Sequence, residues 1–192
     1  GFYSRNKVDG NVTIVSDTST LIDDEVTVSS FQTSGLHSTP AELADKNSIT
    51  VTHGGGHVAF KNKRLQLGAT AVYSDFGGVL NRDLQIYNQF EFEGNNNFVM
   101  GIDYNFIYKN MNFFGETSRS VNGGMATVNG LIFSLDPKYS LAILYRNYGK
   151  NYQSLFSNAI AESSRPVNEH GIYTAVEFKP NPVWSFNAYY DL

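Results

Sequence analysis

From residue 98 to residue 108, the sequence places a large apolar side chain at every second position. These side chains belong to Phe98, Met100, Ile102, Tyr104, Phe106 and Tyr108. Gly101, Asp103 and Asn105 lie between them and are small or polar. Successive side chains of a β-strand point to opposite faces, so this segment is predicted to form a strand with one apolar and one polar face. The medium that each face contacts decides which class of protein the chain belongs to.

The same two-residue period recurs along the 192-residue chain and predicts an all-β fold in a single region, 1–192. An aromatic content of 14% and a charged content of only 17% agree with this, because strands favour aromatic residues and average domains carry more charge. Residues 1–24 are expected to be irregular or to contain partial strands. The predicted strands span 25–35, 48–61, 64–76, 98–109, 112–120, 125–136, 139–149, 170–179 and 183–192.

Short and long connections separate these strands. Within the loop 36–47, Thr39 as N-cap, Pro40 at the first helical position and Glu42 in the first turn predict a short helix. Short turns at one end of the strands and long loops at the other are typical of an outer-membrane β-barrel. The short turns are predicted at 61–63, 109–111, 136–138 and 179–182, and the long loops at 75–97 and 149–169.

A soluble β-sandwich also alternates apolar and polar residues, so the alternation alone leaves both folds open. Three features favour a barrel: the length of strand 98–109, the aromatic residues near strand ends, and the scarcity of Lys and Glu at the polar positions. The candidates for lipid-facing residues are Phe98, Met100, Ile102, Tyr104, Phe106, Trp184 and Phe186. The candidates for lumen-facing residues are Asp103, Asn105, Arg146, Glu177 and Asn187.

The predicted fold is therefore an antiparallel up-and-down transmembrane β-barrel, or an incomplete portion of a larger one. In lipid, every backbone N–H and C=O group must be hydrogen-bonded within the protein, and strands achieve this only in a closed barrel. No apolar run approaches the roughly 20 residues that a membrane-spanning helix needs. Further strands and any export signal are expected to lie outside this sequence.

Several short motifs are distributed along the chain: Phe31–His37, Tyr87–Phe90, Phe113–Glu116, Asn122–Gly124, Leu144–Arg146 with Tyr148, Tyr152–Gln153, and Glu162–Ser164 through Glu169 and Gly171. Together they resemble the barrel region that follows helix-hairpin-helix modules in some bacterial envelope proteins. The similarity covers most of the chain as a pattern, without a catalytic signature. It implies an outer-membrane barrel of poorly defined role. The helix-hairpin-helix modules themselves are absent, so the resemblance carries no DNA contact over to any residue.

The sequence predicts no catalytic site, metal site or cofactor. His53-Gly54-Gly55-Gly56 is similar to an oxyanion-hole motif of esterases, but the G-x-S-x-G nucleophile turn that it requires is missing. On a strand, His53 and His57 would lie about 13 Å apart, too far to share a metal unless the glycines fold the chain back. The acidic run 23–25 is too short for a Ca²⁺ loop, and the absence of cysteine excludes thiolate sites.

The expected function is a non-enzymatic one in the bacterial outer membrane: structural, in transport, or as a docking surface for other envelope proteins. The expected partner is the lipid bilayer, and the net charge of −4 argues against nucleic acid. Tyr148, Tyr152 and Phe156 are candidate binding residues in the loop from Tyr148 to Ser164. One alternative is a soluble secreted β-protein that binds a glycan or a protein through aromatic loops. Another is a hydrolase at the barrel rim, with candidates His37, His170, Asp75, Asp83, Glu162 and Ser163.

Overall fold

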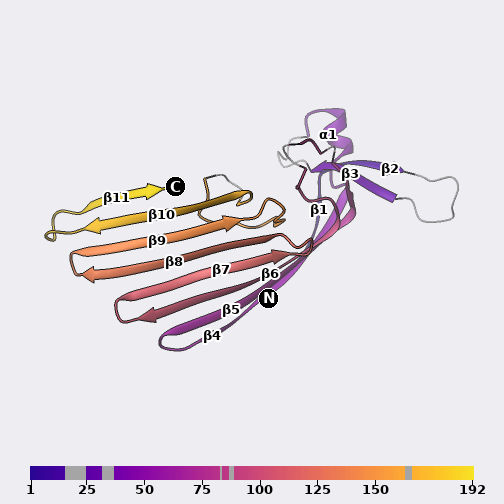
Figure 1. Cartoon of the computed structure of the whole chain (residues 1–192). Coiled ribbons are helices and arrows are strands. Elements are labelled where there is room, and N and C mark those ends of the chain that lie inside the picture. The colour runs from indigo at the N-terminus through magenta and orange to yellow at the C-terminus, as the bar shows by residue number, and fades with distance from the viewer. Residues whose placement is uncertain (16–24, 32–36, 83, 87–88, 163–165) are drawn as a thin grey trace. The chain divides into compact units, whose positions relative to one another are not determined.

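The computed structural model describes residues 1–15, 25–31, 37–82, 84–86, 89–162 and 166–192. Over these residues the chain has eleven strands and a single helix of five residues, which confirms the prediction of an all-β fold (Figure 1). The helix is α1 (Pro40–Ala44). The strands are β1 (Phe2–Val8), β2 (Gly10–Val15), β3 (Glu25–Phe31), β4 (Ile49–Lys61), β5 (Leu65–Leu80), β6 (Gly94–Tyr108), β7 (Met111–Ser120), β8 (Met125–Asp136), β9 (Tyr139–Tyr148), β10 (Glu169–Phe178) and β11 (Phe186–Asp191).

The strands form one mostly antiparallel sheet in the order β1-β4-β5-β6-β7-β8-β9-β10-β11. β2 pairs with β3, and β3 also pairs in parallel with β5 through Thr27–Val79 and Val28–Leu80. From β4 to β11, neighbours in the sheet are neighbours in sequence, as in an up-and-down arrangement. Within the described part of the chain, no strand pairing joins β1 to β11, so these pairings leave the sheet open.

The chain divides into two compact units. Unit 1 comprises residues 1–56 and 72–98, and unit 2 comprises residues 57–71 and 99–192. The strands β4, β5 and β6 each contribute one part to unit 1 and the other part to unit 2.

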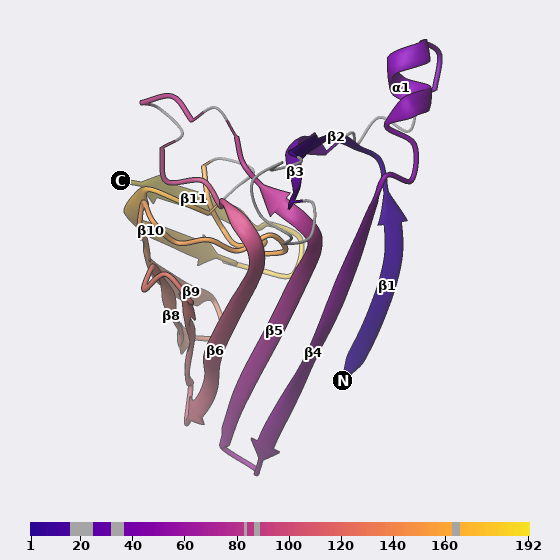
Figure 2. The same cartoon turned by 90° about the vertical axis from the view of Figure 1, so that its right-hand side faces the viewer.

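In unit 1, β1 runs antiparallel to β4, from the pair Phe2–Gly55 to the pair Val8–Ile49 (Figure 2). Residues 2–8 and 10–15, which were expected to be irregular or to contain partial strands, form β1 and β2. On the exposed strand β1, Arg5 and Lys7 occupy positions where the other strands carry apolar residues, so β1 lacks the alternating apolar pattern. A small apolar core holds the unit together and comprises Val28, Ile49, Val51, Phe76, Leu80 and Phe92.

The helix α1 forms at the residues that predict it. The side chain of Thr39 accepts a hydrogen bond from the Glu42 N–H, and the Glu42 carboxylate accepts one from the Thr39 N–H. This reciprocal capping box satisfies two backbone N–H groups that the first turn leaves without helical partners. The predicted loop 75–97 is shorter in the structure, because β5 continues to Leu80 and β6 begins at Gly94.

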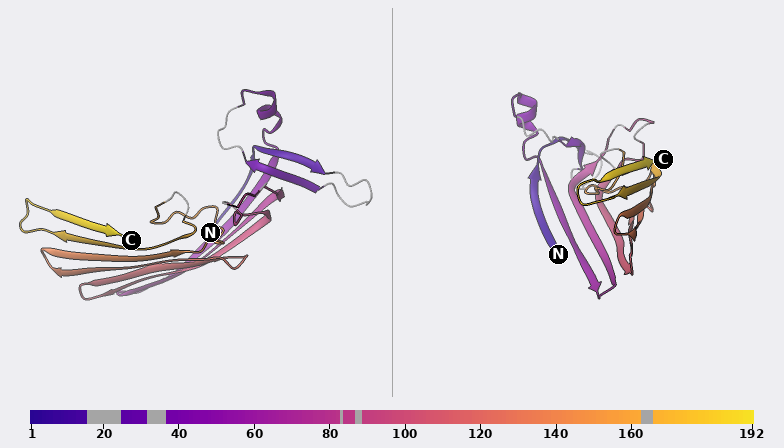
Figure 3. Two further views of the ribbon diagram at one scale, coloured as in Figure 1. Left: turned by 45° about the horizontal axis from the view of Figure 1, so that its top comes forward. Right: turned by 90° about the vertical axis from the view of Figure 1, so that its left-hand side faces the viewer.

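In unit 2, the tight turns and the connection 179–185 lie together at one end of the strands, which we call the turn end (Figure 3). The tight turns are 62–64, 109–110 and 137–138, whereas the predicted short turn 179–182 extends to 185 because β11 begins at Phe186. The connections 121–124 and 149–168 lie at the opposite end, the loop end. Neighbouring strands from β6 to β11 are paired antiparallel, with one register shift between Ser134 and Asp136 of β8. Away from this shift, alternate residues of every strand lie on the same two faces.

Strand register assigns each side chain of unit 2 to one of these faces. Residues that are directly paired in antiparallel strands share a face. One row of paired residues across β6–β10 is Asp103, Glu116, Val128, Arg146 and Gly171. A row on the opposite face, across β6–β11, is Phe106, Phe113, Leu131, Ile143, Thr174 and Tyr190. We call the face that carries Asp103 and Arg146 the polar face, and the other the apolar face.

Candidate functional site

The apolar face of unit 2 extends over six neighbouring strands and exposes large apolar side chains on five of them, β6 and β8 to β11. Met100 and Ile102 on β6, for example, keep 52% and 66% of their surface accessible. Apolar side chains of this size are normally buried, and an exposed patch that continues from strand to strand marks a surface that contacts something other than water. The large apolar side chains on this face are Met100, Ile102, Tyr104, Phe106, Tyr108, Met111, Phe113, Met125, Leu131, Phe133, Tyr139, Leu141, Ile143, Tyr145, Ile172, Val176, Phe178, Phe186 and Tyr190.

Aromatic rings stack along the turn end of this face. The ring centroids of Tyr139 and Phe178 are 4.6 Å apart, and those of Phe178 and Phe186 are 6.3 Å apart. Trp184, which precedes β11, stacks on Phe186 with centroids 6.2 Å apart. Amphipathic rings such as Tyr and Trp favour the boundary between an apolar medium and water, so this row is typical of such a boundary.

A chain of polar side chains crosses the apolar face near its centre. The Tyr104 hydroxyl donates to Asn129 Oδ1 at 3.0 Å, and Asn129 Nδ2 donates to Thr127 Oγ1 at 3.0 Å. The hydroxyl oxygens of Thr127 and Thr117 are 2.8 Å apart. Gly115 makes room for this chain, because a Cβ there would lie 2.5 Å from Asn129 Oδ1. Each of these polar groups therefore has a partner within the protein.

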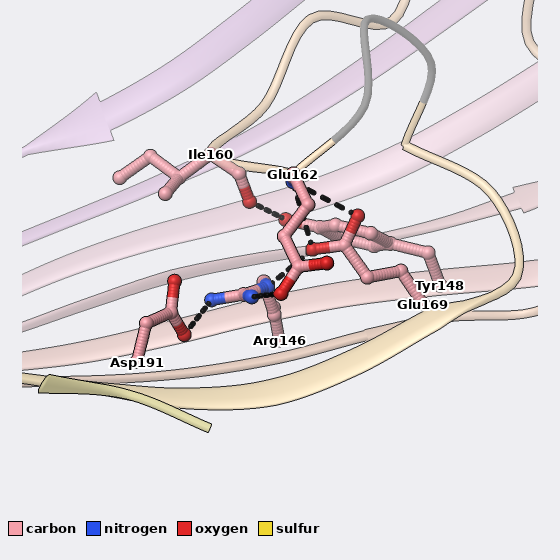
Figure 4. A network of polar contacts seen from close by, with 6 residues as sticks. All are labelled: Arg146, Tyr148, Ile160, Glu162, Glu169 and Asp191. Carbon is pink, nitrogen blue, oxygen red and sulfur yellow. Dashed lines mark hydrogen bonds and ion pairs between the residues drawn. The ribbon is translucent and has the colours of Figure 1, made fainter.

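Arg146 is the centre of an ion-pair cluster on the polar face (Figure 4). Its guanidinium is only 1% exposed and donates to Glu169 Oε1 on β10 and, at 2.7 Å, to Asp191 Oδ1 on β11. A third carboxylate, that of Glu162, lies 3.5 Å from Arg146 Nη2 and is 74% exposed. Burying a guanidinium is costly unless it is paired. Here the ion pairs of Arg146 connect β9 to β10 and to β11.

The structure places the sequence-predicted residues as follows. Asp103, Asn105 and Arg146 lie on the polar face, as do Glu177 and Asn187, which are directly paired. Of the predicted lipid-facing residues, Trp184 lies in a turn, and Phe98 is half-buried and belongs to unit 1. The others lie on the apolar face: Met100, Ile102, Tyr104, Phe106 and Phe186.

The three loop candidates differ in exposure. Tyr148 and Tyr152 are buried and pack with Ala126, so their rings are not available to a ligand in this structure. Phe156 is exposed. Glu169 and Asp191, which pair with Arg146, were not predicted as its partners. Their position on the same face as Arg146 follows only from the strand register, which the sequence does not display.

The rim-hydrolase candidates are not brought together. His37 bonds Asp9 through Nε2 at 2.8 Å, and exposed His170 lies on the apolar face. Asp83 and Ser163 lie outside the described residues, as do residues 23 and 24 of the acidic run. His53 Nδ1 is 3.0 Å from the buried Ser74 hydroxyl, but the glycines that follow His53 lie in an unbroken strand paired with β1.

Among the residues that the structure describes, no group of three or more His, Cys, Asp or Glu side chains is placed to hold a metal ion. No helix within the same residues is long and apolar enough to cross a membrane. No protein-family model matches the sequence, and no curated protein is significantly similar to it. The function is therefore argued from the two faces of unit 2.

Proposed function

We propose that unit 2 is part of the wall of a bacterial outer-membrane β-barrel whose apolar face contacts lipid. The observation that carries this proposal is the exposure of large apolar side chains on one face of β6 and of β8 to β11, with those of β7 between them half-buried. A soluble protein that left this face in water would lose about 25 cal/mol of hydrophobic stabilisation for each Å² exposed. A bilayer removes that cost without a second layer of protein.

The dimensions of the apolar row on β6 agree with a bilayer. From Phe98 to Tyr108 the row spans ten residue intervals, which is about 33 Å at roughly 3.3 Å per residue. At a tilt of about 40° this length corresponds to a height of about 25 Å, the height of the apolar band on outer-membrane barrels. The β5 row from Leu65 to Tyr73 is slightly shorter.

The polar chain on the apolar face is compatible with lipid. A polar group without a partner costs several kcal/mol in hydrocarbon. Because Tyr104, Asn129, Thr127 and Thr117 bond to one another, the four side chains do not require water.

The polar face is suited to the interior of a barrel. Its buried guanidinium, that of Arg146, is paired with strand carboxylates, and Glu177 is paired with Lys179 at 2.7 Å. Closure of the wall requires strand pairing at the free edges of β1 and β11 beyond the pairs described above. The resemblance to the barrel region of envelope proteins supports the same proposal and favours a structural, transport or docking role without catalysis.

The alternative of a soluble glycan- or protein-binding β-protein requires that Phe98, Met100 and Ile102 are core residues. Phe98 is half-buried, but Met100 and Ile102 are exposed, so that function needs another layer of protein over the apolar face. Stacked sheets lie about 10 Å apart and would cover this face completely.

Trp184 is the only tryptophan in the chain and provides a direct test. We expect brominated lipids to quench its fluorescence after the protein is inserted into vesicles, because the turn-end aromatic row then lies at the bilayer interface. The matched control is the double variant Trp184→Phe/Tyr189→Trp, which moves the single indole to the exposed polar face of β11. Its fluorescence should be quenched much less. Equal quenching of the two proteins, or none in either, would overturn the proposal.

A further inference from the structure

The loop that follows β9 crosses the polar face of unit 2 at the loop end. We call residues 149–162 the strap. Its first residues are fixed to the sheet, since the Gly149 N–H donates to the Met125 carbonyl at 2.8 Å and Asn122 Nδ2 donates to the Asn151 carbonyl at 2.7 Å. A Cβ at Gly124 would overlap the Asn151 carbonyl, so the glycine permits this close approach.

The middle of the strap covers small side chains of β7 and β8. The Ser118 hydroxyl donates to the Tyr152 hydroxyl at 2.8 Å, and the Gln153 N–H donates to the Ser120 hydroxyl at 3.2 Å. Tyr152 and Ala161 pack in the cluster around Ala126. The strap therefore hides part of the polar face from solvent.

The far end of the strap is held by the Arg146 cluster (Figure 4). The Glu162 N–H lies 3.1 Å from both carboxylate oxygens of Glu169, and the Glu162 carboxylate lies 3.5 Å from the Arg146 guanidinium. Nearby, the Tyr148 hydroxyl donates to the Ile160 carbonyl at 2.9 Å. These contacts all join the strap to β9 and β10.

Release of this end leaves the strand cluster intact. Arg146 keeps its bonds to Glu169 and Asp191, both of which belong to strands, so no buried charge loses its partners. Glu162 is largely exposed already, and its contact with Arg146 is the longest of the three ion pairs. Three apolar side chains of the strap, Leu155, Phe156 and Ile160, are exposed, whereas Tyr152 is buried. Segments with few buried contacts open at low free-energy cost.

We propose that the strap is a releasable cover over the polar face, latched where Glu162 meets Glu169 and Arg146. Opening the latch admits water and polar solutes to the face beneath. The role of this cover rests on the proposed function, because in a barrel wall the strap would control access to the interior from the loop end.

The test uses the natural absence of cysteine. Ala161→Cys introduces one thiol on the covered side of the strap, and its rate of reaction with a maleimide in detergent reports how often the latch opens. In the Glu169→Gln background we expect labelling to be about fivefold faster, because the strap N–H loses a charged acceptor. Glu162→Gln, which removes only the side-chain contact with Arg146, should accelerate labelling by a smaller factor.

Asp191→Asn is the matched control, because Asp191 bonds Arg146 without contacting the strap. Its labelling rate should match that of the parent Ala161→Cys protein. Equal acceleration in Glu169→Gln and Asp191→Asn would indicate general loosening of the cluster and would overturn the latch, as would unchanged rates in both Glu variants. The labelling test is carried out in detergent and the quenching test in lipid vesicles. A missing acceleration of labelling therefore contradicts the latch, whereas missing quenching of Trp184 contradicts the proposed function.

Discussion

Replacing Ile143 by arginine distinguishes lipid from water at the apolar face. Ile143 lies in the middle of β9, paired with Leu131 and Thr174, and is 38% exposed. Full burial of such a side chain is worth about 1.5–3 kcal/mol, so losing its partial packing costs about 1–2 kcal/mol in water. An arginine on the lipid face near the midplane costs a further 2–4 kcal/mol, approximately. The proposed function therefore predicts a total loss of about 3–6 kcal/mol.

The assay is reversible denaturant unfolding of the protein in lipid vesicles. Asn147→Arg is the matched control, since Asn147 lies on the same face of the same strand but at its loop end, where an arginine costs about 0–1 kcal/mol. We expect Ile143→Arg to lower the free energy of unfolding by at least about 2 kcal/mol more than Asn147→Arg. If the two variants differ by less than about 1 kcal/mol, lipid does not cover β9 and the reasoning fails.

Two further predictions concern packing and pH. Gly130→Ala should destabilise the protein by about 1–3 kcal/mol in the same unfolding assay, because a Cβ there would overlap the Phe114 ring on the polar face. The pKa of the Asp9 carboxyl lies below its ordinary value of 3.8, chiefly because it accepts a hydrogen bond from the Asn47 N–H and also bonds His37. A lowered folded-state pKa stabilises the fold above the ordinary value, and this contribution is lost as the pH falls through the folded-state pKa. Hydrogen exchange at the Asn47 amide should therefore show reduced protection on acidification below about pH 4 in the parent protein. In Asp9→Asn, protection at that amide should not change over the same range.

Much of the sheet could be predicted because a strand imposes a period of two on its own sequence. The alternation in β6 is enough to place Asp103 and Asn105 on one face and Met100 and Ile102 on the other, and the register with β7 agrees. The predicted ranges of β7, β8 and β9 each lie within one residue of the observed ends. These strands have clear turn residues at their ends, so their limits are encoded locally.

Strand ends were missed where tertiary contacts override local signals. Gly77 and Gly78 fall within the predicted loop 75–97, yet both lie in β5. A Cβ at Gly78 would lie 2.8 Å from the Val26 carbonyl, so the glycine serves the close approach of β3. Such an approach joins segments about fifty residues apart and leaves no periodic signal in the sequence.

The Arg146 cluster could be predicted only in part. Alternation within β9 places Arg146 opposite the apolar row, and a cation there requires carboxylate partners. The sequence offers eighteen Asp and Glu residues, and periodicity does not select among them. Glu169 and Asp191 become partners of Arg146 because the register of β9, β10 and β11 places the three side chains close together on one face. Register depends on how the strands pair and cannot be determined from one strand alone.

The residues at which the apolar rows end distinguish lipid from a protein partner better than the residues in the middle of the rows do. Along β5 the row ends at Tyr73 and the next residue on that side is Asp75, while along β9 it ends at Tyr145 before Asn147. On β6 the row begins at Phe98 after Asn96. A protein partner imposes its own outline and has no reason to leave an aromatic ring at each limit. A bilayer interface favours the rings of Tyr73 and Tyr145, because the amphipathic ring of tyrosine is most stable between hydrocarbon and water. On β10 the apolar row stops at Ile172 before His170, so β10 is the one strand of these four without an aromatic ring at the end of its row.

If lipid ends at this level, Ile172→Tyr should leave the free energy of unfolding in vesicles unchanged or raise it. A clear loss of stability in that variant would count against a lipid boundary at this level.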